Sequence, residues 1–252
     1  MDSRNSQGNS NSSGSSRDKK AKRREIQAKK KAIDELIKRA SAETDHLASF
    51  PPFRHFDRNG LSVYLESGSG DKLSSSLKQY IQNLLKVNME KQFGPDWPME
   101  EKVKRRDMVA PEARYIFVHE DPGPSANGIL TQTDKGSLVG FVHYRFTLEE
   151  EIPVLYLYEI QLESRVQGLG LGKFLMQLME LIARKNHMGA VVLTVQKANA
   201  GAINFYTNKL RWEWRRVTKF FAKRLIARLK LHWRKTESVE PSGVSEESSE
   251  LG

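Results

Sequence analysis

A run of six residues, Gln167-Gly168-Leu169-Gly170-Leu171-Gly172, constrains the fold of this chain more than any other segment. It follows an apolar stretch of strand character at residues 154–162 and precedes a helical pattern at residues 173–185. Glycines at such a junction let successive backbone amides turn inward without a Cβ in the way, and the helix adds the positive end of its dipole. The sequence therefore predicts a strand, an anion-binding turn and a helix in series, able to hold a diphosphate.

The spacing of these glycines weighs against two familiar phosphate sites. It lacks the G-x-G-x-x-G pattern of a dinucleotide fold, and no Lys-Ser/Thr pair follows it as in a P-loop. A plain glycine turn that joins a strand to a helix remains the alternative when the loop is considered alone.

Hydrophobic periodicity gives the order of the remaining elements. Helical spacing occurs at residues 73–88, in a charged segment that ends near Met108, and at residues 200–209. Strands are predicted at residues 61–65, 115–118, 137–146, 154–162 and 190–195. Helices followed by a strand meander and then by strand-helix-strand-helix predict an α+β, or mixed α/β, fold.

Composition weighs against several kinds of site. The 252 residues are 38% hydrophobic, which suffices for one good-sized core. There is no cysteine, and the six histidines include no close pair at metal-ligand spacing, so we expect neither disulfides nor a metal site. No stretch of about 18 apolar residues occurs. We therefore expect a soluble intracellular protein without a transmembrane segment, and we expect a monomer.

The net charge of +10 is concentrated at the two ends of the chain. Residues 17–39 contain eleven Lys or Arg against four acidic residues, and residues 215–235 contain nine Lys or Arg and no acid. Such ends attract nucleic acid or chromatin, and the cluster at residues 19–24 resembles a nuclear localisation signal. We expect the protein in the nucleus and cytoplasm. A solvated helix that docks by its apolar face is the plainer interpretation of the first segment.

Composition and periodicity together divide the chain into five parts. The central part is the only one with the alternating elements of a catalytic domain. The predicted parts are a disordered tail at 1–16, a basic helical segment at 17–49, a catalytic domain at 50–214, a basic amphipathic helix at 215–235 and an acidic disordered tail at 236–252.

Two motifs carry a resemblance to a known superfamily. Gln167-x-x-Gly170-x-Gly172 resembles the Q/R-x-x-G-x-G/A signature of the GNAT acetyltransferases, and residues 199–206 resemble their N-x-x-A-x-x-F/Y-Y element. Over residues 31–210 the chain is similar to the N-alpha-acetyltransferase D family, whose members modify histone amino termini. The segments that carry this narrower resemblance are residues 56–61, 155–164, 170–175 and 193–195.

The resemblance implies a fold and a coenzyme. It implies a central, mostly antiparallel sheet flanked by helices, with an N-terminal helix, and acetyl-CoA as co-substrate without a metal. Backbone amides of the glycine loop would hold the pyrophosphate, while the splayed strand end and an asparagine would bind the pantetheine arm. The coenzyme-binding residues implied are Ile160, Gln161, Leu162, Gln167, Gly168, Leu169, Gly170, Leu171, Gly172, Lys173 and Asn199.

Glu159 is the candidate catalytic residue. Strand alternation puts it on one face with Leu157 and Gln161, directly before the coenzyme loop, where a hydrophobic core does not explain a carboxylate. Taken alone, a cross-strand ion pair would account for it, but the residue matches the family's catalytic glutamate. A carboxylate can take the proton that an α-ammonium must lose before its direct attack on the thioester.

The resemblance also implies a substrate, the Ser-Gly-Arg-Gly amino terminus of histone H4 and histone 2A. The matching substrate-binding residues are Phe93, Trp97, Glu149, Tyr156, Tyr158 and Thr194. Glu149 could pair with the arginine at the third position of the substrate. Two positions depart from the family. The family has an acidic residue where this chain has Thr147, and a tyrosine where this chain has Phe93. Loop packing is the alternative role for Phe93 and Trp97, and an ordinary strand position is the alternative for Thr194.

Two features near the end of the domain are open. Tyr206 occupies the position from which many GNAT enzymes protonate the leaving thiolate, but core packing is the preferred interpretation. After Leu210 the resemblance stops, and the family's final sheet-closing strand is not recognisable. An alternative carboxyl terminus would explain the change, and so would a native basic helix that binds nucleic acid or an acidic membrane surface.

Overall fold

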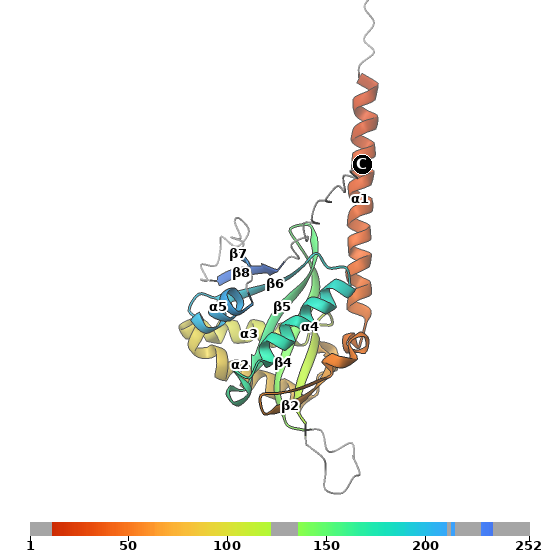
Figure 1. The fold of residues 1–252 in the computed structure, drawn as a ribbon. Coiled ribbons are helices and arrows are strands. Elements are labelled where there is room, and N and C mark those ends of the chain that lie inside the picture. The colour runs from red at the N-terminus through yellow and green to blue at the C-terminus, as the bar shows by residue number, and fades with distance from the viewer. Residues whose placement is uncertain (1–11, 122–135, 211–212, 215–227, 234–252) are drawn as a thin grey trace, which may run out of the picture.

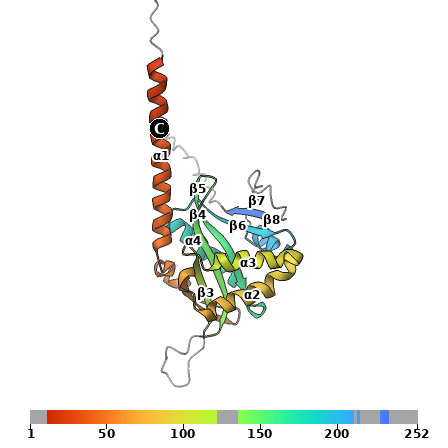
Figure 2. The same cartoon turned by 180° about the vertical axis from the view of Figure 1, so that it is seen from behind.

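A twisted sheet between two layers of helices organises the protein (Figures 1 and 2). The computed structural model describes residues 12–121, 136–210, 213–214 and 228–233. The strands are β1 (His55–Arg58), β2 (Leu61–Ser69), β3 (Arg114–Glu120), β4 (Leu138–Glu149), β5 (Ile152–Leu162), β6 (Ala190–Gln196), β7 (Glu213–Trp214) and β8 (Arg228–Trp233). The α-helices are α1 (Ser12–Ala42), α2 (Ser75–Phe93), α3 (Trp97–Met108), α4 (Leu171–Lys185) and α5 (Ala200–Asn204).

Short helical turns connect these elements. Residues Gly94–Asp96 form a 3-10 turn between two helices, so that Phe93 ends α2 and Trp97 begins α3. Helix α5 continues as a single π-helical turn, η6 (Phe205–Lys209). The remaining 3-10 turns are His46–Ser49, Pro51–Phe53, Gly70–Lys72 and Ser164–Val166.

The sheet has the strand order β1-β2-β3-β4-β5-β6-β8-β7, and the expected mostly antiparallel arrangement is confirmed. Strands β5 and β6 form a parallel pair, but their pairing runs only from Val154 opposite Ala190 to Leu157 opposite Leu193. Beyond Leu157 the two strands separate. Because β5 continues to Leu162 beside β4, its other edge has no neighbouring strand among the described residues at the place where the glycine loop begins.

A β-bulge in β5 overturns the predicted alternation of this strand. His143 of β4 lies opposite Glu159, but the next residue, Tyr144, lies opposite Leu157, so Tyr158 is the extra residue. A bulge re-aims the side chains that follow it. Leu157 and Ile160 therefore pack in the core beneath α4, while Glu159 turns to the opposite face of the sheet. The predicted shared face of Glu159 and Leu157 is wrong, because the alternation rule assumes an unbroken ladder.

Each face of the sheet has its own core. On one face α4 and the end of α1 cover apolar residues from all the central strands, among them Val142, Leu155 and Leu193. On the other face α2 and α3 cover Tyr115, Phe117 and Phe141. Helix α4 buries a continuous stripe at helical spacing, which includes Leu171, Leu175, Leu178 and Ile182. The cavity described below opens on the face covered by α2 and α3.

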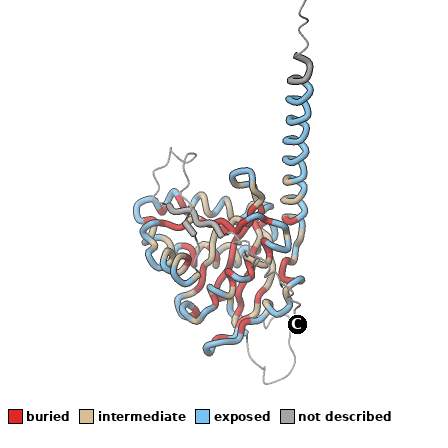
Figure 3. Tube along the Cα trace, turned by 45° about the horizontal axis from the view of Figure 1, so that its top comes forward, coloured by how far each residue is buried: buried red, intermediate tan, exposed pale blue. Residues whose placement is uncertain are grey.

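Helix α1 confirms the predicted helical segment but begins earlier than expected. It starts at Ser12, so residues 12–16 are helical although the sequence predicted disorder to residue 16. Residues 17–32 are all exposed, and only the last turns, with Leu36, Ile37 and Ala40, pack on the domain (Figure 3). Buried His46 fixes this end, because its ring bonds Ala40 O and the Tyr144 hydroxyl, each at 3.0 Å.

The carboxyl end differs from the sequence-based expectation. Residues 228–233 form β8, which pairs antiparallel with β6 from Val191 opposite Trp233 to Gln196 opposite Arg228. The helix predicted over residues 215–235 is therefore wrong for this part, because pairing with an open sheet edge outweighs a helical pattern of apolar residues. Residues 215–227 and the acidic tail lie outside the described residues. In the part of the chain that the structure describes, no helix is long and apolar enough to span a membrane.

Candidate active site

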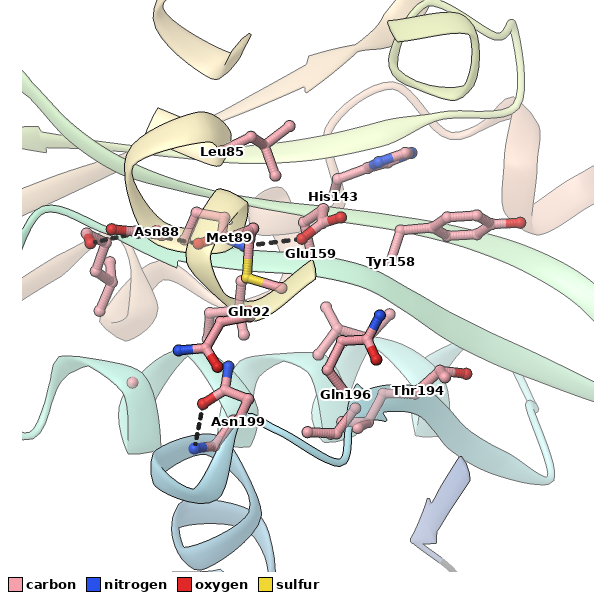
Figure 4. Close-up of a pocket in the computed structure, with 18 of the residues that line it drawn as sticks. Leu85, Asn88, Met89, Gln92, His143, Tyr158, Glu159, Thr194, Gln196 and Asn199 are labelled. Atoms are coloured by element: carbon pink, nitrogen blue, oxygen red, sulfur yellow. Dashed lines mark hydrogen bonds between the residues drawn. The ribbon is translucent and has the colours of Figure 1, made fainter. Parts of the chain in front are cut away.

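A cavity of about 1760 Å³ lies between α2, α3 and the separated ends of β5 and β6 (Figure 4). Its rim is completed by the glycine loop, α5 and η6. Most of the residues singled out from the sequence meet here although they come from different helices, strands and connecting segments. Those that line it are Phe93, Glu149, Tyr156, Tyr158, Glu159, Ile160, Gln161, Leu162, Gln167, Gly168, Gly170, Gly172, Lys173, Thr194 and Asn199.

Three of the predicted site residues do not line the cavity. Trp97 is buried behind Phe93, with the two rings 5.9 Å apart, so it packs the turn between α2 and α3. Leu171, the first residue of α4, is buried in the core. Leu169 packs against that core, and its carbonyl accepts a 2.8 Å hydrogen bond from Asn59. The side chains of these residues support the site from outside.

The glycine loop has the geometry of an anion site. Gly168 and Gly170 have φ angles of +78° and +93°, which residues with a Cβ rarely adopt. Gly170 directly precedes the first turn of α4, whose free amides and dipole favour negative charge. Gln167 anchors the start of the loop through a 2.9 Å hydrogen bond from Nε2 to Leu162 O. Lys173, which also lines the cavity, adds a cation, so these residues fit the diphosphate of coenzyme A.

Glu159 has protein donors on both carboxylate oxygens. Lys104 of α3 forms an ion pair with Oε1, and Gln161 Nε2 donates to Oε2 at 2.8 Å. Asn88 of α2 orients Gln161 by donating to its Oε1 at 3.0 Å. The side chains of Glu159 and Lys104 are only 9% and 18% exposed, so water screens this pair poorly.

His143 lies beside Glu159 in the ladder and is almost completely buried. Its ring stacks between Tyr115 and Tyr158, with centroids 4.9 Å away on both sides. Its Nε2 has no hydrogen-bond partner among the described residues. Burial lowers the pKa of His143 well below its usual range, and the cations Arg145 and Lys104 act in the same direction. The imidazole is therefore neutral near pH 7.

The far end of the cavity, where β5 and β6 begin to part, is polar and aromatic. The Tyr156 hydroxyl and Thr194 Oγ1 are 2.5 Å apart, and the Arg145 guanidinium lies 4.5 Å from the centre of the Tyr158 ring. Glu149 ends β4 on this side, before the two-residue turn to β5. Because alternate residues of a strand share a face, Thr147 faces the same way as Arg145 and Glu149.

The structure refines the expected roles of two further residues of the rim, Asn199 and Tyr206. The Asn199 side chain caps α5, because its Oδ1 accepts from Ala202 N at 3.0 Å, which leaves its Nδ2 as the group that can reach a ligand. Tyr206 is buried but borders the cavity. Burial raises the pKa of Tyr206, and the charge of Glu159 raises it further, so its hydroxyl stays protonated. This hydroxyl keeps the ability to donate a proton or a hydrogen bond.

Sequence reasoning missed several residues of the site. Lys104 belongs to a charged helix that reads as solvated, Asn88 ends a helical stripe, and His143 sits in a strand without any motif. Their roles come from the packing of α2 and α3 over the bulge in β5. No group of three or more His, Cys, Asp or Glu residues within the described ranges is arranged to hold a metal ion.

Residues 86–210 match the family described as the Acetyltransferase (GNAT) family. This stretch contains the glycine loop, the bulge at Tyr158 and Asn199, which are the features that build the cavity. Over these residues the chain belongs to the GNAT acetyltransferases, and the donor of its acetyl group is acetyl-CoA.

Several solved structures are similar to this chain. An acetyltransferase from Streptococcus agalactiae has 13% identity and a TM-score of 0.49, over 68% of this chain and 98% of that one. A GNAT acetyltransferase from Listeria monocytogenes has 12% identity and a TM-score of 0.47, over 71% and 99%. NAA60 of Arabidopsis thaliana, in complex with a bisubstrate analogue, has 12% identity and a TM-score of 0.46, over 69% and 99%.

Proposed function

We propose that this enzyme acetylates the N-terminal α-amine of peptides that begin Ser-Gly-Arg-Gly, the amino terminus of histone H4 and histone 2A. The observation that carries the proposal is the position of Glu159. The bulge at Tyr158 turns this carboxylate into the cavity where β5 and β6 separate, between the glycine loop and the polar end with Glu149. An acetyl donor held by the loop and a peptide entering from the polar end would meet beside it.

The residues of the loop and of β5 account for coenzyme binding. Amides at Gly168 and Gly170 and the first turn of α4 would hold the diphosphate, with Lys173 as counter-charge. The free edge of β5 at Ile160 and Leu162 offers backbone groups to the pantetheine arm and to the acetyl carbonyl. The bound thioester supplies an already activated acetyl group, so the protein needs to position the amine and manage its proton.

The polar end of the cavity supports recognition of the peptide. Glu149 is the acidic group that the proposal assigns to the substrate's arginine, and Thr147 faces the same side of β4. Tyr156, Tyr158 and Thr194 line the same cavity as Glu149 and Glu159. Thr147 cannot supply the second carboxylate that the resembling family has at this position. We therefore propose a preference for arginine at the third residue of the peptide, with Glu149 as the one carboxylate assigned to bind it.

The proposal is tested with acetyl-CoA and two peptides, Ser-Gly-Arg-Gly and Ser-Gly-Ala-Gly. We expect acetyl on the α-amine of both, located by fragmentation in a mass spectrometer, and a larger kcat/KM for the arginine peptide. Equal values for the two peptides would remove the histone-like specificity. Acetylation confined to lysine ε-amines of histone tails would instead identify a lysine acetyltransferase.

A second candidate function is nucleic-acid binding, and exposed α1 favours it. Residues 17–32 form a helix without tertiary cover that holds nine Lys or Arg and two acidic residues, and it projects from the domain in every view (Figures 1 to 3). Such a helix suits contact with a phosphate backbone in chromatin. Its basic run is also accessible to an import receptor, so we propose a nuclear as well as a cytoplasmic location.

Salt dependence tests this second function. Affinity of the full chain for a short DNA duplex should fall steeply between 50 mM and 200 mM salt (the range in which such contacts weaken), whatever the base sequence. Replacing Lys19, Lys20, Lys22, Arg23 and Arg24 with Gln should weaken binding and leave peptide acetylation unchanged. DNA binding without acetylation of either amine would support a catalytically weak chromatin-binding protein.

A further inference from the structure

Lys104 is the one cation in direct contact with Glu159 among the described residues. Its side chain reaches from α3 to Oε1 of the carboxylate and also passes 5.3 Å from the centre of the Phe93 ring. Lys104 and Glu159 both line the cavity, and the side chains of both are largely buried. A substrate ammonium that approaches Glu159 therefore meets a carboxylate whose charge is already balanced by the protein.

We propose that Lys104 is a specificity-determining residue: its ion pair with Glu159 makes the site accept the uncharged form of an amine, which favours N-terminal α-amines over lysine side chains. The inference rests on the proposed function, because it takes an α-amine as the acceptor. It adds the means by which the same site distinguishes the two classes of amine.

The reason is the cost of burying a charge. An ammonium that leaves water for this cavity loses its hydration, and the neutral Lys104–Glu159 pair offers it no net counter-charge. An uncharged amine pays no such cost and can donate an N–H to the carboxylate. Lys104 thus converts a site that would attract cations into one that selects against them.

The buried imidazole and phenol groups around the pair keep one protonation state near neutral pH. His143 is neutral because burial and the nearby cations lower its pKa. Tyr115 and Tyr206 stay protonated, because burial raises the pKa of both and the charge of Glu159 adds to the effect. The acidic and basic side chains on the surrounding elements are Glu100 and Asp107 on α3, Lys91 on α2, Arg145 and Glu149 on β4, Lys173 on α4, Lys197 after β6 and Lys209 on η6.

The size of the preference for α-amines over lysine side chains follows from the pKa values of the two ammonium groups. An α-ammonium has a pKa of about 8, and a lysine ε-ammonium has a pKa of about 10.4. At pH 7 roughly one α-amine in ten is uncharged, but only about one lysine in 2500. A site that accepts only the uncharged form therefore favours the α-amine about 250-fold before any contact with the rest of the peptide.

The reaction balances with this assignment. The uncharged nitrogen attacks the thioester carbonyl carbon, forming a C–N bond, and the C–S bond of the thioester then breaks. Glu159 accepts the proton that the nitrogen must lose once it has bonded to carbon. That proton ends on the leaving sulfur, so the products are the acetylated amine and coenzyme A as its thiol.

Proton release on binding tests the proposal directly. The full chain saturated with coenzyme A is titrated with Ser-Gly-Arg-Gly at pH 7 by calorimetry in two buffers of different ionisation enthalpy. We expect the wild type to release about 0.9 proton per peptide, since the bound amine is uncharged and the free amine is mostly protonated. The Lys104→Met variant should release close to none, because Glu159 is then free to bind the ammonium itself.

Two control variants distinguish the effect of the charge at position 104 from a change in the structure. Lys104→Arg keeps the cation and should keep the proton release of the wild type. Lys102→Met makes the same substitution at an exposed position of α3 outside the cavity and should also behave as wild type. In addition, kcat/KM of the wild type for the α-amine should rise tenfold per pH unit up to about pH 8, and that of Lys104→Met should rise less steeply.

The outcomes are distinguishable from those of the proposed function. A peptide that binds the wild type without releasing a proton would overturn the role of Lys104 even if no variant folds. Equal release by the wild type and a folded Lys104→Met protein would overturn it as well. Acetyl found on lysine, or a peptide that does not bind, would overturn the proposed function and this inference together.

Discussion

Replacing Glu159 with Gln removes the charge of the candidate base while keeping its shape. The substitution also leaves the ammonium of Lys104, only 18% exposed, without its counter-charge. Breaking a buried ion pair by removing one partner costs about 3 to 5 kcal/mol, and the remaining exposure of Lys104 reduces this cost. We therefore expect Glu159→Gln to lower the free energy of unfolding by about 2 to 3 kcal/mol.

The double variant Glu159→Gln with Lys104→Met removes both charges from the same site. Because replacing a buried pair by uncharged groups of similar volume is often neutral, most of the lost stability should return. Activity should not return, since the proton acceptor is still missing. General base catalysis contributes about a hundredfold to ten-thousandfold, so kcat should fall by at least about a hundredfold in both variants.

Urea denaturation measures the first effect, and steady-state acetylation measures the second. Binding of coenzyme A is the control and should change less than about twofold, since the glycine loop does not contact Glu159. Wild-type turnover in Glu159→Gln would remove this residue from the mechanism. A stability loss that persists in the double variant would show that the ion pair is not its cause.

Three other changes test separate parts of the structure. Gly170→Ala forces a Cβ into a φ of +93° and should weaken coenzyme A binding about tenfold by direct titration, whereas Gly60→Ala, at φ +74° and away from the cavity, should cost stability alone. Burial lowers the pKa of His46, so below the unfolded pKa of about 6.5 the unfolded chain binds more protons than the folded chain. The urea midpoint should therefore fall as the pH is lowered from about 7 to about 5.5, and it should fall less in the His46→Gln variant. Thr147→Asp adds a carboxylate beside Glu149 and should raise the preference for Ser-Gly-Arg-Gly over Ser-Gly-Ala-Gly about tenfold, an unchanged ratio meaning that position 147 does not face the peptide.

The sequence was sufficient for the order of elements and for the turn at the glycine loop. Local patterns dictate these features: the glycines of the loop have positive φ where the chain must turn, and α4 carries an unbroken apolar stripe. The predicted strands and helices within residues 61–209 are present with small shifts at their ends. The acetyl-CoA dependence of the chemistry also follows from the same motifs.

The surroundings of Glu159 could not be read from the sequence in the same way. The direction of this side chain depends on a bulge at Tyr158, which is defined by the register with β4 and leaves no mark in the alternating pattern. Lys104 and Asn88 reach the carboxylate network only because α2 and α3 pack over the sheet. Strand β8 pairs with β6 although its sequence has a helical pattern, because a sheet edge supplies hydrogen bonds that a local pattern cannot anticipate.

The central claim, transfer of acetyl to an N-terminal α-amine, is tested most directly on one peptide that carries both kinds of amine. Ser-Gly-Arg-Gly-Lys-Gly and acetyl-CoA are incubated with the full chain at pH 7, and fragmentation in a mass spectrometer locates the acetyl group. The account predicts acetyl on the α-amine in at least about hundredfold excess over the lysine. Acetyl mainly on the lysine, or shared equally between the two amines, would contradict it.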